Sequence, residues 1–90
     1  MTDLKQFIVN NKISFEPGMR NHGSTILSGF ALHNGNTLEE VKNSIPFEYI
    51  NTDKKKEEVF KELERVYQFA ESRNYGKYWE TEEAKKIYKY

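Results

Sequence analysis

The sequence contains no cysteine, no excess of either charge and no long hydrophobic run. Without cysteine the chain forms no disulfide, no thiolate zinc site and no cysteine nucleophile. Because proteins without disulfides are typical of reducing compartments, we expect a cytoplasmic protein. No segment approaches the roughly 20 apolar residues that cross a membrane. The first residues, Asp3 among them, do not resemble a signal peptide, so we expect a soluble protein without membrane contact.

The charges balance, with 14 lysines and arginines against 14 aspartates and glutamates. Nucleic-acid binding depends on neutralising phosphates, so this balance argues against a dedicated nucleic-acid-binding domain. Lysine far outnumbers arginine and asparagine is frequent, a usage typical of A/T-rich genomes such as those of low-GC bacteria and their phages. The length of 90 residues predicts a single small domain, residues 1–90. A chain this short has a thin core.

Two segments have the pattern of β-strands. Residues 12–16 alternate, with Ile13 and Phe15 on one side, and residues 24–32 are apolar on both faces. Gly29 inside the second segment predicts a bulge or a close backbone approach. Residues 47–50 fit either a third short strand or an extended connection. The sequence therefore predicts a short antiparallel sheet.

The remaining segments predict helices. An N-terminal helix would be capped by Thr2 or Asp3, and another would begin with a capping box of Thr37 and Glu40. Residues 53–73 keep a 3.6-residue apolar period and predict a long amphipathic helix. A C-terminal helix follows, with Thr81 as its cap. With the sheet packed against the last two helices, the predicted fold class is α+β.

The stretch GMRNHGST, residues 18–25, resembles a phosphate-binding G-x-x-x-x-G-K-[ST] loop, but serine stands in the lysine position. A phosphate loop also precedes a helix, whereas here a predicted strand follows. We interpret the stretch as a loop between strands. Its exposed Arg20, Asn21 and His22 are candidates for contact with a partner. We expect Arg20→Ala to leave stability nearly unchanged.

No residue pattern indicates catalysis. The two histidines, His22 and His33, lie eleven residues apart without neighbouring pairs of carboxylates, and this is not a metal-binding spacing. No signature places a histidine beside Ser24, Thr25 or Ser28 as a nucleophile. We therefore expect no enzyme, cofactor or metal.

The C-terminal segment combines aromatic and basic residues. Tyrosine, tryptophan and arginine are the residue types most enriched at binding hot spots, although some of these aromatics must also serve the core. The interface candidates in this segment are Arg73, Tyr75, Lys77, Tyr78, Trp79, Lys85, Tyr88, Lys89 and Tyr90.

These features predict a small non-enzymatic protein-binding module. One hypothesis is an inhibitor from a phage or mobile element that sterically blocks a host protein. The alternative is single-stranded nucleic-acid binding through the aromatic and lysine-rich C-terminal segment, because bases stack on aromatic side chains. A homo-oligomer that uses the same surface is a further alternative.

Overall fold

The computed structural model describes residues 3–90, and no β-strand occurs among them. The α+β prediction is therefore wrong, and the described chain is all-helical. Thr2, one of the two predicted caps, lies outside the described residues. The helical elements in chain order are α1 (Leu4–Asn10), α2 (Arg20–His33), α3 (Leu38–Asn43), the 3-10 helix η1 (Phe47–Tyr49), α4 (Asp53–Ser72), the 3-10 helix η2 (Tyr75–Glu80) and α5 (Glu82–Ile87).

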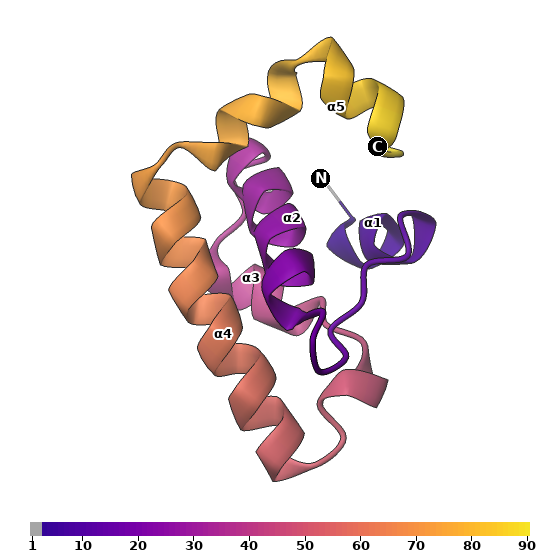
Figure 1. Cartoon of the computed structure of the whole chain (residues 1–90), viewed down its shortest axis with the longest axis vertical. Helices are drawn as coiled ribbons and strands as arrows, with labels where there is room; N and C mark the ends of the chain where they lie inside the picture. The colour runs from indigo at the N-terminus through magenta and orange to yellow at the C-terminus, as the bar shows by residue number, and fades with distance from the viewer. Residues whose placement is uncertain (1–2) are drawn as a thin grey trace.

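Helix α2 lies at the centre of the molecule. In Figure 1, α4 runs along one side of α2, η2 and α5 pass across its upper end, and α1 lies on its other side. Ser24, Leu27, Ser28 and Ala31 form a fully buried stripe on α2 with helical spacing. Because three of these four side chains are small, neighbouring helices can approach α2 closely.

The strand predicted at 24–32 is wrong because this segment belongs to α2. A short apolar run with hydrophobic residues on both faces fits a buried helix as well as a strand. The start of α2 also carries no local signal, because Met19 occupies the N-cap position without a side-chain hydrogen bond. The close approach predicted at Gly29 is confirmed, since a Cβ atom there would lie 2.8 Å from Nε1 of Trp79.

The strand predicted at 12–16 is also wrong. Ile13 and Phe15 are buried as their alternation predicts, but the segment is a connection between α1 and α2 and pairs with no strand in residues 3–90. Residues 47–50 are neither a strand nor an extended connection, because they contain the 3-10 helix η1. Alternation thus identified buried side chains and not backbone pairing.

The predicted helices are confirmed where the local signals are strong. Asp3 caps α1, and Thr37 and Glu40 form both hydrogen bonds of the predicted capping box. Helix α4 begins after a cap at Thr52, and α5 begins after the predicted cap at Thr81. Caps and a long apolar period are properties of adjacent residues, so the sequence alone identifies them.

Aromatic rings join the two ends of the described chain to α2. Phe7 of α1 stacks on Phe30 of α2 with 3.8 Å between ring centroids, and Trp79 meets both rings edge-on. The hydroxyl of Tyr90 donates to the carbonyl of Trp79. The side chain of Asn11 also exchanges two hydrogen bonds, of 2.7 and 3.0 Å, with the backbone of Lys89. The last residues therefore pack against α1.

Candidate binding groove

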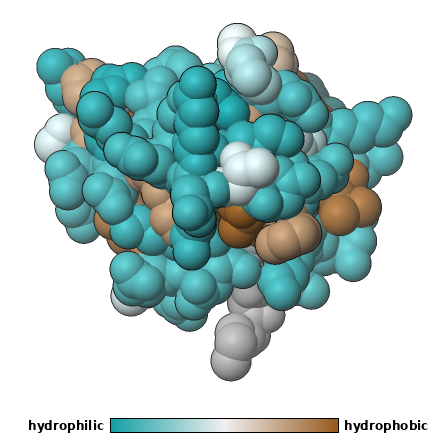
Figure 2. Space-filling view, turned by 90° about the horizontal axis from the view of Figure 1, so that it is seen from below, coloured by the Kyte–Doolittle hydropathy of each residue, from teal (hydrophilic) through white to brown (hydrophobic). Residues whose placement is uncertain are grey.

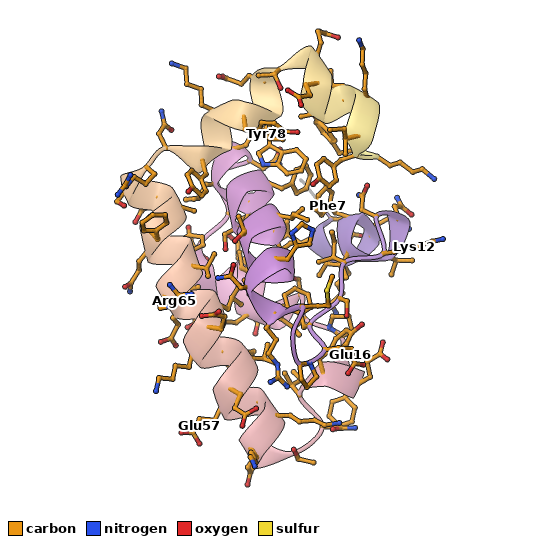
Figure 3. All side chains as sticks on the ribbon, in the orientation of Figure 1. Phe7, Lys12, Glu16, Glu57, Arg65 and Tyr78 are labelled. Atoms are coloured by element: carbon orange, nitrogen blue, oxygen red, sulfur yellow. The ribbon has the colours of Figure 1, made fainter. Side chains whose placement is uncertain are left out.

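A hollow of about 390 Å³ lies between the outer face of α2 and the C-terminal elements. We call it the aromatic groove. Its lining residues are His22, Thr25, Ile26, Gly29, Tyr75, Tyr78, Trp79 and Tyr88. Figure 3 labels Tyr78 where η2 passes the upper end of α2. Neither lysine nor arginine nor a carboxylate is among these lining residues.

Helical periodicity places the side chains of the aromatic groove. His22, Ile26 and Gly29 follow one another by four and three residues, so they share one face of α2. Side chains three residues apart eclipse each other in a 3-10 helix, and Tyr75 and Tyr78 of η2 have this spacing. Both tyrosines therefore point to the same side.

A second hollow of about 340 Å³ adjoins the aromatic groove and shares Thr25 and Tyr75 with it. Its other lining residues are Asn21, Arg65, Val66 and Phe69. The ring of Tyr75 meets that of Phe69 edge-on at 5.8 Å, and so Tyr75 stands between the two hollows. In Figure 3, Arg65 marks the α4 side of this surface.

The tyrosines of the groove are partly exposed. Tyr75 and Tyr78 are each 37% exposed, and Phe69 is 44% exposed. Burial of the phenol raises the pKa of Tyr78 above its ordinary value, and the negative charge of Glu83 raises it further. The phenol of Tyr78 is therefore a neutral hydrogen-bonding group at physiological pH.

The structure brings five of the predicted interface candidates together. His22, Tyr75, Tyr78, Trp79 and Tyr88 line the aromatic groove, although they come from distant parts of the sequence. Trp79 is also part of the core, because only 3% of its surface is exposed. Asn21 lines the adjoining hollow.

The basic candidates are not among the lining residues of the aromatic groove. Arg73 covers the ring of Phe69 at 4.8 Å, and Lys77 lines a separate hollow between α2, α4 and η2. Lys85 pairs with Glu82 at 3.6 Å. Lys89 and Tyr90 line a hollow beside α1. Arg73, Lys77, Lys85 and Lys89 are therefore spread over different places around the groove.

The predicted exposed loop at residues 20–22 is wrong, because these residues form the first turn of α2. Arg20 is a structural residue: its Nε donates to the carbonyl of Phe15 at 3.1 Å, and its guanidinium lies 2.9 Å from the carboxylate of Glu58. Its side chain is only 16% exposed. The expectation that Arg20→Ala leaves stability unchanged therefore does not fit its contacts.

The glycines of the phosphate-loop resemblance have local roles. Gly18 has a φ of 91°, a conformation that glycine adopts without strain. Gly23 lies inside α2, where a Cβ atom would stand 2.3 Å from the carbonyl oxygen of Ser14. A helix and not a strand follows the turn, so the strand expected there is wrong. The buried positions of Gly23 and Ser24 still leave no cradle for a phosphate.

The histidines and serines do not assemble a reactive site. His22 and His33 both lie on α2, and eleven residues of helix separate them by about 16 Å along the axis. Ser24 and Ser28 are fully buried and so cannot reach a substrate. Within residues 3–90, no group of three or more histidine and carboxylate side chains could hold a metal ion.

Sequence reasoning missed Ile26 and Phe69 as surface residues of this site. Ile26 lies in the segment 24–32, for which the sequence predicts a strand, so its place on the face of a helix was not expected. Phe69 lies beside the buried stripe of α4, which includes Val66 and Ala70. A large apolar side chain on the flank of an amphipathic helix was the available signal for Phe69.

Comparisons of the chain with protein-family models, curated proteins and solved structures found no match. None of the helices in residues 3–90 combines the length and apolar character needed to cross a membrane.

Proposed function

We propose that the protein is a binding module that takes up a segment of another protein in the aromatic groove. The observation that carries this proposal is the convergence of Tyr75, Tyr78 and Tyr88 with the apolar Ile26 on one concave surface. Tyrosine supplies a large contact area and loses little conformational entropy on binding. Binding and steric occlusion need no catalytic group.

The end of the molecule opposite η2 and α5 offers less aromatic surface. Figure 2 shows the end of the molecule opposite η2 and α5, where hydrophilic residues dominate and hydrophobic ones form small separate areas. Phe47 of η1 is 75% exposed but is not among the residues that line any of the hollows described above. It therefore provides a matched control for removal of an exposed aromatic side chain.

Single-stranded nucleic acid is the less favoured ligand. Stacking surfaces for bases combine aromatic side chains with a positively charged path for the phosphates. The aromatic groove has no lysine or arginine in its lining, and Arg73, Lys77, Lys85 and Lys89 lie at different places around it. The hypothesis of a phage or mobile-element inhibitor stays a prediction, as does the cytoplasmic location.

Affinity capture tests the proposal. Wild-type protein, Tyr78→Ala and Phe47→Ala are used as baits in lysate of a low-GC bacterium, with and without nuclease, and captured proteins are then purified and titrated directly. We expect a nuclease-resistant partner whose affinity falls at least tenfold with Tyr78→Ala and stays unchanged with Phe47→Ala. Equal affinity for both variants would contradict the use of the groove. Loss of the signal with nuclease would favour nucleic acid, and self-association in sedimentation would favour a second copy of the chain.

A further inference from the structure

Within residues 3–90, the indole N–H of Trp79 is a hydrogen-bond donor without an acceptor. Among residues 3–90, the one side-chain hydrogen bond that involves Trp79 uses its backbone carbonyl, which accepts from the hydroxyl of Tyr90. The indole Nε1 lies directly against Gly29, which lines the aromatic groove together with Trp79. Because Gly29 has no side chain, the N–H edge of the indole contributes to the floor of the groove. A ligand that fills the groove displaces water from this N–H group and must supply an acceptor in its place, so this position favours a ligand that accepts a hydrogen bond.

The tyrosine hydroxyls of the groove also lack hydrogen-bond partners within the described residues. In the described part of the chain, Tyr67 and Tyr90 donate to backbone carbonyls, whereas the hydroxyls of Tyr75, Tyr78 and Tyr88 have no hydrogen-bond partner. The groove therefore combines apolar ring surface with several free donors and no lysine, arginine or carboxylate. Its ligand should be uncharged where it enters the groove and rich in acceptors.

We infer that the aromatic groove binds an extended, proline-rich segment of a partner protein. This inference rests on the proposed function and adds the chemical class of the ligand. A polyproline II segment leaves all its carbonyl groups unpaired, and proline has no N–H that would need an acceptor. Its carbonyls match the indole and hydroxyl donors, and its rings match the tyrosine faces, as in other aromatic-lined grooves that bind such segments.

Other peptide conformations fit the groove less well. The backbone carbonyls of an α-helix are already hydrogen-bonded within the helix, so a helical ligand would leave the donor of Trp79 unpaired. An extended strand needs a sheet edge to pair with its own N–H groups, and residues 3–90 contain no strand.

The adjoining hollow gives the ligand a second contact. In a P-x-x-P segment the two prolines lie on the same edge, about 9 Å apart, because polyproline II has three residues per turn and a rise of about 3.1 Å. Tyr75 stands between the aromatic groove and the hollow lined by Val66 and Phe69. The inference therefore places one of the two prolines in each hollow.

Trp79 is the single tryptophan of the chain and reports directly on the groove. The test titrates full-length protein with a decaproline peptide, an alanine-rich helical peptide and a glycine–serine peptide of equal length. The readouts are tryptophan fluorescence and the single indole ¹H–¹⁵N resonance. We expect a saturable fluorescence change and a downfield shift of the indole proton with decaproline only. No shift at millimolar decaproline, or equal shifts with the other peptides, would overturn the inference.

Two substitutions at one position complete the test. Tyr78→Ala should weaken decaproline binding at least tenfold and Tyr78→Phe severalfold, whereas Phe47→Ala should leave it unchanged. Equal binding by wild type and Tyr78→Phe, which keeps the ring, would overturn the role of the hydroxyl even if Tyr78→Ala failed to fold. If decaproline fails but a captured protein still depends on Tyr78, the ligand class is wrong and the proposed function stands. If capture is also independent of Tyr78, both proposals fall.

Discussion

At the scale of single residues, Arg20 is the clearest example of a side chain whose role depends on distant partners. Phe15 precedes it by five residues, but Glu58 lies on α4, 38 residues away in sequence. In the sequence, Arg20 follows Gly18 by two residues and Pro17 by three, and this composition is typical of an exposed loop. Only the packing of α4 against α2 gives it an acidic partner and removes most of its side chain from solvent.

Arg20→Ala should lower the free energy of unfolding by about 1–3 kcal/mol, because it removes a charge-assisted hydrogen bond to a backbone carbonyl as well as an ion pair. Urea unfolding at neutral pH measures this. Glu58→Ala is the control: it removes only the ion pair to a half-exposed carboxylate and should cost less than about 1 kcal/mol. An unfolding midpoint of Arg20→Ala equal to that of the wild type would restore the interpretation as an exposed loop residue.

At the scale of elements, α2 is unusual in its small buried side chains. The hydroxyls of Ser24 and Ser28 are buried, and in the described chain neither has a hydrogen-bond partner. Gly29 follows Ser28 directly but faces Trp79, which leaves no room for a side chain. Loss of the hydroxyl at Ser28 should therefore stabilise α2, whereas a side chain added at Gly29 should destabilise it.

Alanine substitutions at these two positions should have effects of opposite sign. Ser28→Ala removes an unpaired buried hydroxyl and favours the helix, so it should raise the free energy of unfolding by about 0.5–1 kcal/mol. Gly29→Ala brings a methyl group against the indole and should lower it by about 1–3 kcal/mol, despite the higher helix propensity of alanine. Thermal unfolding of the two variants measures both, and shifts of equal sign would contradict this account of α2.

Helices α4 and α2 differ in how well their own sequences predict them. Helix α4 was predicted to within one residue because its cap at Thr52 and its apolar period are contained in its own sequence. Residues 24–32 of helix α2 were predicted as a strand because their apolar residues lie on both faces and the buried stripe includes the polar Ser24 and Ser28, so no helical apolar period stands out. Its aromatic groove could not be predicted for the same reason, since Ile26 and Gly29 reach that surface only when the segment is helical.

At the scale of the whole molecule, Trp79 links the C-terminal elements to the rest of the core. Phe7, Phe30 and Tyr90 surround its ring, and Gly29 lies against its edge. Trp79→Ala should cost about 3–5 kcal/mol. A small domain has only about 5–15 kcal/mol in total, so we expect partial or complete unfolding in circular dichroism. A variant with the melting temperature of the wild type would show that these contacts stabilise little.

The free energy of unfolding should also depend on pH, in both the acidic and the alkaline range. The backbone N–H of Thr37 donates to the carboxylate of Glu40 and lowers its pKa, so this stabilisation is present at neutral pH and is lost as the pH falls through the lowered value. The carboxylate of Glu64 raises the pKa of Lys42, and burial raises the pKa values of Tyr67 and Tyr78. The stabilisation from these three groups is present below their ordinary pKa values and is lost as the pH rises through the raised ones.

We therefore expect a melting temperature that is nearly constant around neutrality and falls above about pH 10. Differential scanning calorimetry across the pH range measures this, and ultraviolet absorbance follows ionisation of the tyrosines. Tyr67→Phe should flatten part of the alkaline fall. A constant melting temperature from pH 9 to pH 12 would contradict the raised values.

The sequence by itself determined where the capped helices begin, how long α4 is, the absence of disulfides and the neutral charge, because each depends on adjacent residues or on composition. Tertiary structure decided that residues 20–33 are helical and that Trp79 is buried while Tyr78 stays partly exposed. It also decided that His22 meets the C-terminal tyrosines. These outcomes depend on which segments, distant in sequence, pack together and bury their apolar side chains. A short segment with apolar residues on both faces fits a helix and a strand equally well, so its own sequence does not decide between them.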